Sequence, residues 1–287
     1  MNTLKTYNIL YINLDHRNDR KKYIEDQLKK MNLMKRKKYI TKRISGVLGT
    51  TIDKHYKQLA KEFKVQPQQM TEAFWLSRKN FKTMSNHKNK VLGRVGCFLA
   101  HLRALRYAIK HNLKNVIILE DDCTFIQNET FKFPKPPKDN DMFYIGGLFR
   151  HLSSTIQPIN ISNNWLLIDP TKIKFYCTFG YGFSNKKSIK HATTLTESVW
   201  LPGKGKEKPL DWTSGKEKIR GNVTDVLYVN FIQRFGISYV LVQPLCIQAE
   251  GFISDVTNFG KNTPAKPSNM SYFYNKLYEK KYIETLN

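Results

Sequence analysis

Apolar and polar positions alternate along the first part of the chain in a strand–helix–strand pattern. Residues 7–14 form an apolar run that predicts a strand, and residues 39–45 predict a second strand. Between them, apolar residues recur at helical spacing, and Asn18 or Asp19 is expected to cap this helix. Strands and a helix in this order predict a βαβ unit, whose two strands run parallel.

The most informative apolar run is residues 116–119, which leads directly into Glu120, Asp121 and Asp122. An uninterrupted apolar run predicts a buried strand in a sheet that is covered on both faces. Adjacent carboxylates repel one another, and burial removes their solvation, so a cation or a donor-rich ligand is needed to offset them. Ligands of open α/β sheets bind beyond the carboxyl ends of the strands, where these acids are expected. A solvated acidic turn is the alternative, and the stretch alone leaves both open.

The rest of the chain predicts further elements of one α/β sheet. Apolar spacing predicts a helix leading from Gly93, whose glycines allow close approach to other backbone, with His101 on its inner side. Such a histidine is more often a hydrogen-bonded core residue than a ligand. Further strands are expected at residues 142–145, 165–168, 175–183, 237–242 and 245–247, and helices near 186–195 and from 225.

Glycine and proline positions indicate where these strands end or bend. Gly146 and Gly147 are expected to end the strand before them. Gly180 and Gly182 alternate with aromatic residues, which indicates either a β-bulge or a ligand close to the backbone. Pro244 lies between the last two strands and favours an edge or a bend.

Length and composition suggest one large domain with an insertion and a tail. Residues 1–250 are expected to form the domain, and a chain of 287 residues can bury a sizeable core. The polar segment at about residues 50–90 predicts a partly helical insertion, either a lid or a surface loop without a chemical role. Residues 201–221 predict a loop over the sheet edge. Residues 251–287 predict a tail whose amphipathic helix packs on the domain.

The charge balance is strongly basic, with 48 Lys and Arg against 23 Asp and Glu, a formal net charge of +25. The resulting positive field suits nucleic acid, an anionic membrane surface or a phosphorylated small molecule. The lysines are spread along the chain, and a coding bias toward Lys, Asn and Ile explains them equally well. No helix-turn-helix, RNP or zinc-finger pattern is present, so nucleic acid is not an expected partner, whereas peripheral contact with an anionic membrane stays open.

Cysteine usage and hydropathy indicate a reducing, cytoplasmic location. None of the four cysteines has CxxC spacing, and each lies in or beside an apolar stretch: Cys97, Cys123, Cys177 and Cys246. This pattern favours reduced, packed thiols over a disulfide framework or a zinc site. Neither a secretory h-region nor an apolar run of about 18 residues is found.

Several short motifs occur in an order and spacing that resemble glycosyltransferase family 25, which includes bacterial lipopolysaccharide sugar transferases and procollagen galactosyltransferases. The motifs are residues 12–15 with Arg17 and Arg20, residues 96–101 (GCFLAH), residues 119–122 (LEDD), residues 180–184 (GYGFS), and Gln248 with Ser254 and Asp255. The chain departs from the family pattern at Ala100, where serine is usual, at His16, and in the insertion. A bacterial or viral member is expected.

The resemblance implies a GT-A fold, which is a Rossmann-like nucleotide-diphospho-sugar transferase fold with a central, mostly parallel mixed sheet. It also implies a UDP-sugar donor and a divalent cation, usually Mn²⁺. A diphosphate leaving group develops negative charge that a carboxylate-bound cation neutralises, and manganese suits carboxylate oxygens. By similarity to other acid triplets of this fold, Asp122 is expected to touch the metal, and Glu120 and Asp121 to orient the ribose and the metal's surroundings. Asp255 is a second candidate metal ligand.

The resemblance also suggests residues for the donor and for the chemistry. Asn13, Arg17 and Arg20 are candidates for binding uracil and the phosphates, because guanidinium groups pair bidentately with phosphate oxygens. The alternative for both arginines is a solvated helix start. Transfer with inversion needs a base, and Asp225 is expected to supply it, 225 − 122 = 103 residues past the metal ligand. A plain N-cap role for Asp225 is the alternative, with Asp211 and Asp255 as rival bases.

The expected function is therefore that of a metal-dependent, inverting glycosyltransferase, which moves galactose or glucose from a UDP-sugar to a hydroxyl group. A glycan and a hydroxylysine in a collagen-like chain are both acceptors that fit. Two other functions stay open. The first is a family member that binds sugar nucleotides or glycans without catalysis, and the second, less favoured, is a basic nucleic-acid-binding protein.

Overall fold

The structure is a computed structural model of the chain, and it describes most of its residues. They are residues 4–65, 67, 88–150, 161–162, 164–169, 174–200, 224–242, 244–249 and 252, with a few side chains inside these ranges left out. Much of the predicted insertion, the loop at 201–221 and nearly all of the tail therefore lie outside the described residues. The helical character expected for the insertion is confirmed at its start, where α2 (Ile52–Phe63) follows the short helix η2 (Gly49–Thr51).

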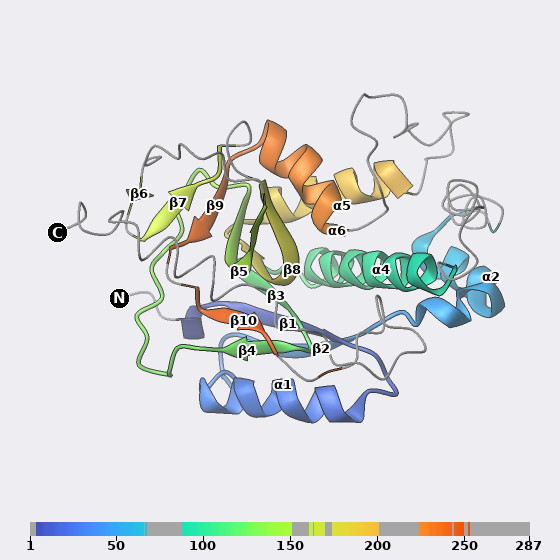
Figure 1. Cartoon of the computed structure of the whole chain (residues 1–287), viewed down its shortest axis with the longest axis horizontal. Helices are drawn as coiled ribbons and strands as arrows, with labels where there is room; N and C mark the ends of the chain where they lie inside the picture. Colours follow the sequence, from blue (N-terminus) through green and yellow to red (C-terminus); the bar gives the residue numbers. More distant parts are fainter. Residues whose placement is uncertain are drawn as a thin grey trace.

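The predicted βαβ unit is confirmed. Strand β1 (Asn8–Asn13) leads through helix α1 (Asn18–Lys30) to strand β2 (Thr41–Ser45), and the two strands pair in parallel. Strand β3 (Val116–Glu120) pairs in parallel with the other side of β1. Helices α1 and α4 (Lys88–Lys110) lie on opposite sides of these strands (Figure 1). Both faces of β3 are therefore covered, as its uninterrupted apolar run predicts.

Helix α1 starts differently from the prediction, which is wrong about its cap. Arg17 occupies the N-cap position, and its side chain makes no capping hydrogen bond. Arg17 instead donates two hydrogen bonds to the Asp19 carboxylate, from Nε at 3.0 Å and Nη2 at 2.8 Å. The carboxylate thus has a bidentate cationic partner, which competes with a capping interaction.

The main sheet has eight strands in the order β2-β1-β3-β8-β5-β9-β7-β6. The strands not yet given are β5 (Met142–Arg150), β6 (Ile161–Ser162), β7 (Trp165–Leu167), β8 (Lys174–Phe183) and β9 (Ser238–Leu241). Strand β8 pairs antiparallel with both β3 and β5, and β7 pairs antiparallel with both β9 and β6. Because β5 and β9 are parallel, six strands share one direction and two are reversed. The mixed, mostly parallel α/β sheet is confirmed.

Strand β5 corrects the prediction that Gly146 and Gly147 end it, because it continues to Arg150. The glycines coincide with shifts in its register against β8. A Cβ on Gly146 would lie 2.2 Å from the carbonyl oxygen of Cys246, so only glycine fits there. Opposite it, Gly180 and Gly182 face protein side chains, with the Cys246 Sγ and the Phe143 ring filling the spaces that Cβ atoms would need.

A second, two-stranded sheet lies beside the acids. Strand β4 (Cys123–Phe125) pairs antiparallel with β10 (Cys246–Gln248), which follows β9 after the bend at Pro244. The bend predicted from the proline is thus confirmed. In the pairing register, Gln248 lies opposite Cys123, and the Ala249 N–H donates to the Asp122 carbonyl at 2.6 Å. This small sheet brings the C-terminal part of the described chain to the end of β3.

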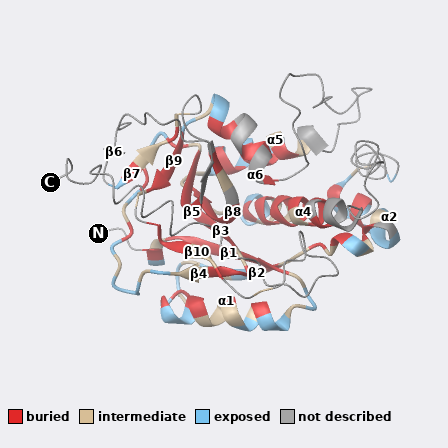
Figure 2. Ribbon diagram, in the orientation of Figure 1, coloured by how far each residue is buried: buried red, intermediate tan, exposed pale blue. Residues whose placement is uncertain are grey.

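A single cluster of buried apolar side chains extends from Leu4 to Cys246. Figure 2 shows the central strands as buried and the outer side of α1 as exposed. Helix α4 starts at Lys88, so Gly93 and Gly96 lie in its interior, and a Cβ on Gly96 would be 2.2 Å from the Val47 carbonyl oxygen. This confirms the close backbone approach. Helix α5 (Lys186–Trp200) packs on α4, and α6 (Thr224–Leu227), continued by the π-helical turn η4 (Tyr228–Gln233), packs on β8.

Two further predictions concern the thiols and membrane insertion. Cys97, Cys123 and Cys246 are not in disulfides, and the last two are buried, in agreement with packed thiols. Among the described residues, every helix is too short or too polar to cross a bilayer.

Candidate functional site

The three acids lie at the carboxyl end of β3, next to the loop that follows β1. Ile12 of β1 pairs with Glu120 of β3, and both strands run in the same direction. The loop after Asn13 and the acids after Glu120 therefore occupy the same edge of the sheet. Two of the acids are nearly inaccessible, with Asp121 7% and Asp122 5% exposed. A solvated acidic turn does not fit this burial.

Asp121 is fully engaged by the first strand and the first helix. Its Oδ2 accepts a hydrogen bond from Asn13 Nδ2 at 2.8 Å, and its Oδ1 accepts one from Arg20 Nη1 at 2.9 Å. Asn13 also donates to the Arg17 carbonyl at 3.0 Å and accepts from Arg43 Nε at 2.9 Å. Burial nevertheless holds the pKa of Asp121 above its usual value, because the Arg20 charge offsets only part of the lost solvation.

Asp122 is the acid whose interactions are incomplete. Its Oδ2 accepts from Gln248 Nε2 at 3.1 Å and from Arg20 Nη1 at 3.4 Å. Its Oδ1 is buried and has no hydrogen-bond partner among the described residues. Burial, and then the charge of Glu120, raise the pKa of Asp122 to about 7. A buried carboxylate oxygen without a partner is costly unless a cation or a donor occupies the space beside it.

Glu120 faces the other side of β3, toward α4 and β8. Its Oε1 accepts from the Thr178 hydroxyl at 2.6 Å and lies 3.3 Å from His101 Nε2. The other ring nitrogen of His101, Nδ1, is 2.7 Å from the Tyr181 hydroxyl, which lies 3.4 Å from the Tyr228 hydroxyl. Burial alone would raise the pKa of Glu120, but His101 and Thr178 outweigh it and hold the pKa below its usual value. The prediction of a hydrogen-bonded core histidine is confirmed.

The two candidate arginines occupy different environments. Arg20 is buried against Asp121 and Asp122, and its guanidinium lies 5.2 Å from the centroid of the Phe252 ring. Arg17 pairs with the exposed Asp19 at the start of α1. Arg20 therefore acts as a counter-ion within the acid cluster, which a solvated helix start does not explain. Phosphate binding by either arginine stays a prediction.

The remaining candidates lie at the boundary of the described chain. Asp225 is the second residue of α6, directly after the 201–223 segment, and its side chain is not described. Tyr228, one turn later, joins the buried tyrosine pair that leads to His101. Asp255 and Asp211 lie outside the described residues, so their roles stay predictions.

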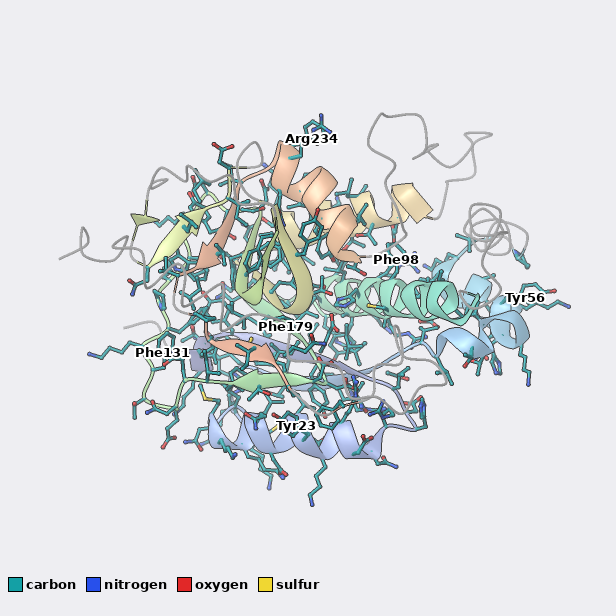
Figure 3. The ribbon with its side chains drawn as sticks, in the orientation of Figure 1. Tyr23, Tyr56, Phe98, Phe131, Phe179 and Arg234 are labelled. Carbon is teal, nitrogen blue, oxygen red and sulfur yellow. The ribbon has the colours of Figure 1, made fainter. Side chains whose placement is uncertain are left out.

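Several residues of the site were not singled out by sequence reasoning. They are Arg43 on β2, Thr178 on β8 and Tyr23 on α1, whose hydroxyl lies 2.6 Å from that of Thr124. Figure 3 labels Tyr23 on α1 and Phe98 on α4, the helices that flank the central strands. The sequence did contain a signal for Thr178. It lies two residues before Gly180, which belongs to one of the family motifs, and residues two apart on a strand share a face.

The fold and the site define an α/β protein with a buried, incompletely paired acid cluster at the carboxyl ends of parallel strands. The model of glycosyltransferase family 25 (LPS biosynthesis protein) matches residues 6–190. The match covers 185 of 287 residues and includes β1, the loop after it, α4, the acids and β8. The chain belongs to this family, and it is a glycosyltransferase. A search of curated proteins finds no match to the chain.

The extent of the family match separates the candidate residues into two groups. Asn13, Arg17, Arg20 and the three acids lie inside it. Gln248, Asp225 and Asp255 lie beyond residue 190, although Gln248 contacts Asp122 directly. The family match therefore covers the acids and the loop after β1 but none of the three candidates from the C-terminal part of the chain.

Proposed function

We propose that this glycosyltransferase moves a hexose, galactose or glucose, from a UDP-sugar to an acceptor hydroxyl with inversion at the anomeric carbon, and that it uses a divalent cation. The observation that carries the proposal is the buried Oδ1 of Asp122, which has no partner among the described residues. It lies at the sheet edge where ligands of open α/β folds bind. The direction shared by six of the eight strands also suits a GT-A arrangement.

The donor set around Asp122 fits a hard divalent cation. Manganese prefers carboxylate oxygens, and a cation beside Oδ1 would offset both the burial and the Glu120 charge that raise the pKa of Asp122. Asp255 is the proposed second ligand, because it follows Gln248, which already contacts Asp122, by seven residues. When bound, the cation would neutralise the charge that develops on the diphosphate leaving group.

We assign donor orientation, phosphate binding and proton abstraction to separate residues of the chain. Asn13 and Arg20 hold Asp121 in place, so in this proposal they position the acid that orients the ribose together with Glu120. Arg17 is the proposed phosphate contact, since it lies between β1 and α1, in the loop at the same sheet edge as the acids. Asp225 is proposed as the base that takes the proton of the acceptor hydroxyl, because it opens the helix beside β8.

Calorimetric titration of UDP tests the donor site. With Mn²⁺ present, we expect micromolar binding that disappears in EDTA and in Asp122→Asn. A matched control is Asp26→Asn, which removes an exposed carboxylate on α1 that pairs only with Lys29 among the described residues, and it should bind UDP normally. UDP binding that is unchanged by both EDTA and Asp122→Asn would contradict the metal site, and no binding under any condition would contradict the donor.

Transfer assays with UDP-galactose and UDP-glucose test the reaction itself. Acceptors should include glycans and hydroxylysine-containing collagen-like peptides, and NMR of the product distinguishes inversion from retention. Donor binding without turnover over the whole panel would instead indicate a non-catalytic sugar-nucleotide-binding protein. Loss of turnover with intact UDP binding is the result expected for Asp225→Asn.

A further inference from the structure

Cys97, His101 and Glu120 form a cluster of metal-ligating groups next to the acid cluster. Their ligand atoms, a thiol sulfur, a ring nitrogen and a carboxylate oxygen, all lie within 4.8 Å of one another. Two come from α4 and the third from the end of β3. We propose that these three residues bind zinc, with Oε1 of Glu120 as the carboxylate ligand and its other oxygen left for the ribose, in a site chemically distinct from that of Asp122.

The helix supplies two ligands in a geometry that metal sites use. Cys97 and His101 are four residues apart on α4, so their side chains project from the same face. Two ligands at this spacing on one helix are a recurring arrangement in zinc proteins. Gly96, beside Cys97, brings α4 against the backbone near Val47, which fixes this part of the helix relative to the sheet. The ligand-bearing face is therefore held by backbone packing.

The imidazole of His101 is already oriented for a ligand. Its ring is 1% exposed, its Nδ1 is 2.7 Å from the Tyr181 hydroxyl, and its Nε2 faces Glu120. Metal-bound histidines almost always use their second nitrogen in a hydrogen bond that fixes the ring. Tyr181 supplies that bond and is itself supported by Tyr228 at 3.4 Å. The ring therefore already directs Nε2 toward the Glu120 carboxylate, and an ion bound between them would not require it to turn.

Ligand separations and softness favour zinc over manganese here. Zinc binds sulfur at about 2.3 Å and nitrogen or oxygen at about 2.0–2.2 Å, which places tetrahedral ligands roughly 3.3–3.7 Å apart. His101 Nε2 and Glu120 Oε1 are already 3.3 Å apart. No two ligand atoms of the cluster are more than 4.8 Å apart, so a closing movement of at most about 1 Å is needed, which rotation of a side chain provides. A thiolate ligand selects zinc over the harder ions.

The cluster is open to solvent on one side. The Glu120 side chain is 28% exposed, and Cys97 is partly exposed, whereas His101 is buried. A hydrated ion can therefore reach the two outer ligands first, and a fourth coordination position remains for water. The lack of CxxC spacing made a zinc site unexpected from the sequence. Two of the ligands come from a helix, and the third, Glu120, lies at a strand end 19 residues after His101.

Cobalt titration of the reduced, metal-free full-length protein tests the site. Cobalt bound by a thiolate absorbs in the near ultraviolet through charge transfer, which carboxylate ligands at Asp122 do not produce. We expect this absorption to saturate at one equivalent and to disappear when zinc is added. Cys97→Ala and Cys97→Ser should abolish it and weaken zinc binding by at least about 100-fold, since losing even an outer-shell partner costs roughly 10–100-fold.

Cys123→Ala is the matched control, because Cys123 is buried in β4 and does not belong to the cluster. It should retain the cobalt absorption, with circular dichroism used to verify that each variant is folded. Absence of the absorption in the unsubstituted protein at saturating cobalt would overturn the proposal without any variant. Absorption that survives both substitutions of Cys97 would overturn it as well.

Discussion

The two ends of strand β1 are stabilised in opposite ways. At its amino end, Tyr7 packs edge-to-face on Phe133 and Phe143, with ring centroids 5.2 and 5.9 Å apart. Trp165 completes this aromatic cluster, 5.5 Å from Phe143. At the carboxyl end of β1, Asn13 joins Asp121, Arg20 and Asp122 in the acid cluster through directional hydrogen bonds.

The difference shows what each end contributes. The aromatic cluster is buried without charge, and its one unmet polar group among the described residues is the indole Nε1 of Trp165. The acid cluster buries carboxylates, leaves one oxygen of Asp122 without a partner among the described residues, and raises the pKa of two acids. The first end therefore contributes mainly apolar burial, and the second concentrates buried charge. Substitutions at the two ends should therefore affect the free energy of unfolding and UDP affinity separately.

The largest effect is expected from Phe143→Ala in the aromatic cluster. Removing this fully buried ring should lower the free energy of unfolding by about 3–5 kcal/mol, because it loses apolar contacts and leaves a cavity. Denaturant unfolding measures the change. Phe235→Ala is the matched control, because Phe235 is 76% exposed and its loss should cost less than about 0.5 kcal/mol. UDP affinity per folded molecule should not change; a large loss of affinity would contradict the division between the two ends.

The second effect is expected from Asp122→Asn in the acid cluster. Metal-dependent UDP affinity should fall on the order of 100-fold, equivalent to about 2.7 kcal/mol, because a proposed metal ligand is lost. Without metal, the free energy of unfolding should stay the same or rise by up to about 1 kcal/mol, since the repulsion from Glu120 is relieved. Calorimetry and denaturant unfolding measure the two quantities. A destabilised variant would show that Asp122 is a structural residue.

A smaller effect is expected from Asn13→Ala, which removes the link between β1 and the acids. Its loss leaves Asp121 and Arg43 each without one hydrogen bond, so the free energy of unfolding should fall by roughly 1–3 kcal/mol. UDP affinity should also fall, by about tenfold or less, because Asp121 loses one of its two orienting bonds. Asn18→Ala, at an exposed position on α1, is the control. Unchanged stability would contradict the role of Asn13 as a buried connector.

The smallest effect is expected from Asp19→Asn at the helix start. The hydrogen bond from Arg17 and backbone N–H groups lowers the pKa of Asp19 to about 2. The stabilisation is therefore present above about pH 4 and is lost as the pH falls through 2. Because Asp19 is 54% exposed, it should amount to less than about 1 kcal/mol. Unfolding of both proteins at pH 7 and pH 3 measures it; a difference that grows at pH 3 would have the wrong sign.

Local patterns in the sequence predict the backbone of the site but not its side-chain partners. The apolar run before Glu120 predicts β3, and the tendency of ligands to bind beyond the carboxyl ends of strands predicts a site at the acids. The pairing of His101 with Glu120 depends on the rotation of α4 against β3, which only tertiary packing sets. The contact of Gln248 with Asp122 spans 126 residues and depends on the bend at Pro244.

The same limits explain the errors at strand and helix ends. The two glycines suggested that β5 ends at Gly146, because glycine is generally unfavourable within a strand. In the structure the strand continues, and Gly146 is needed because a side chain there would collide with the backbone of Cys246. Asn18 and Asp19 were expected to cap the helix from residue type alone, but Arg17 occupies the N-cap position and pairs with the Asp19 carboxylate. In both cases a neighbour overrides a local preference.

The reversed strand β8 has a consequence for synthesis on the ribosome. It pairs with β3 on the side away from β1, so the strand that carries the acids lacks one neighbour until residues 180–183 have emerged. At about 5–20 residues per second, the 60 residues between Glu120 and Gly180 take about 3–12 s to make. During this interval the hydrogen-bonding edge of β3 that β8 will cover is open to other nascent chains. Chaperone binding should therefore concentrate on ribosome-bound chains that end between β3 and β8.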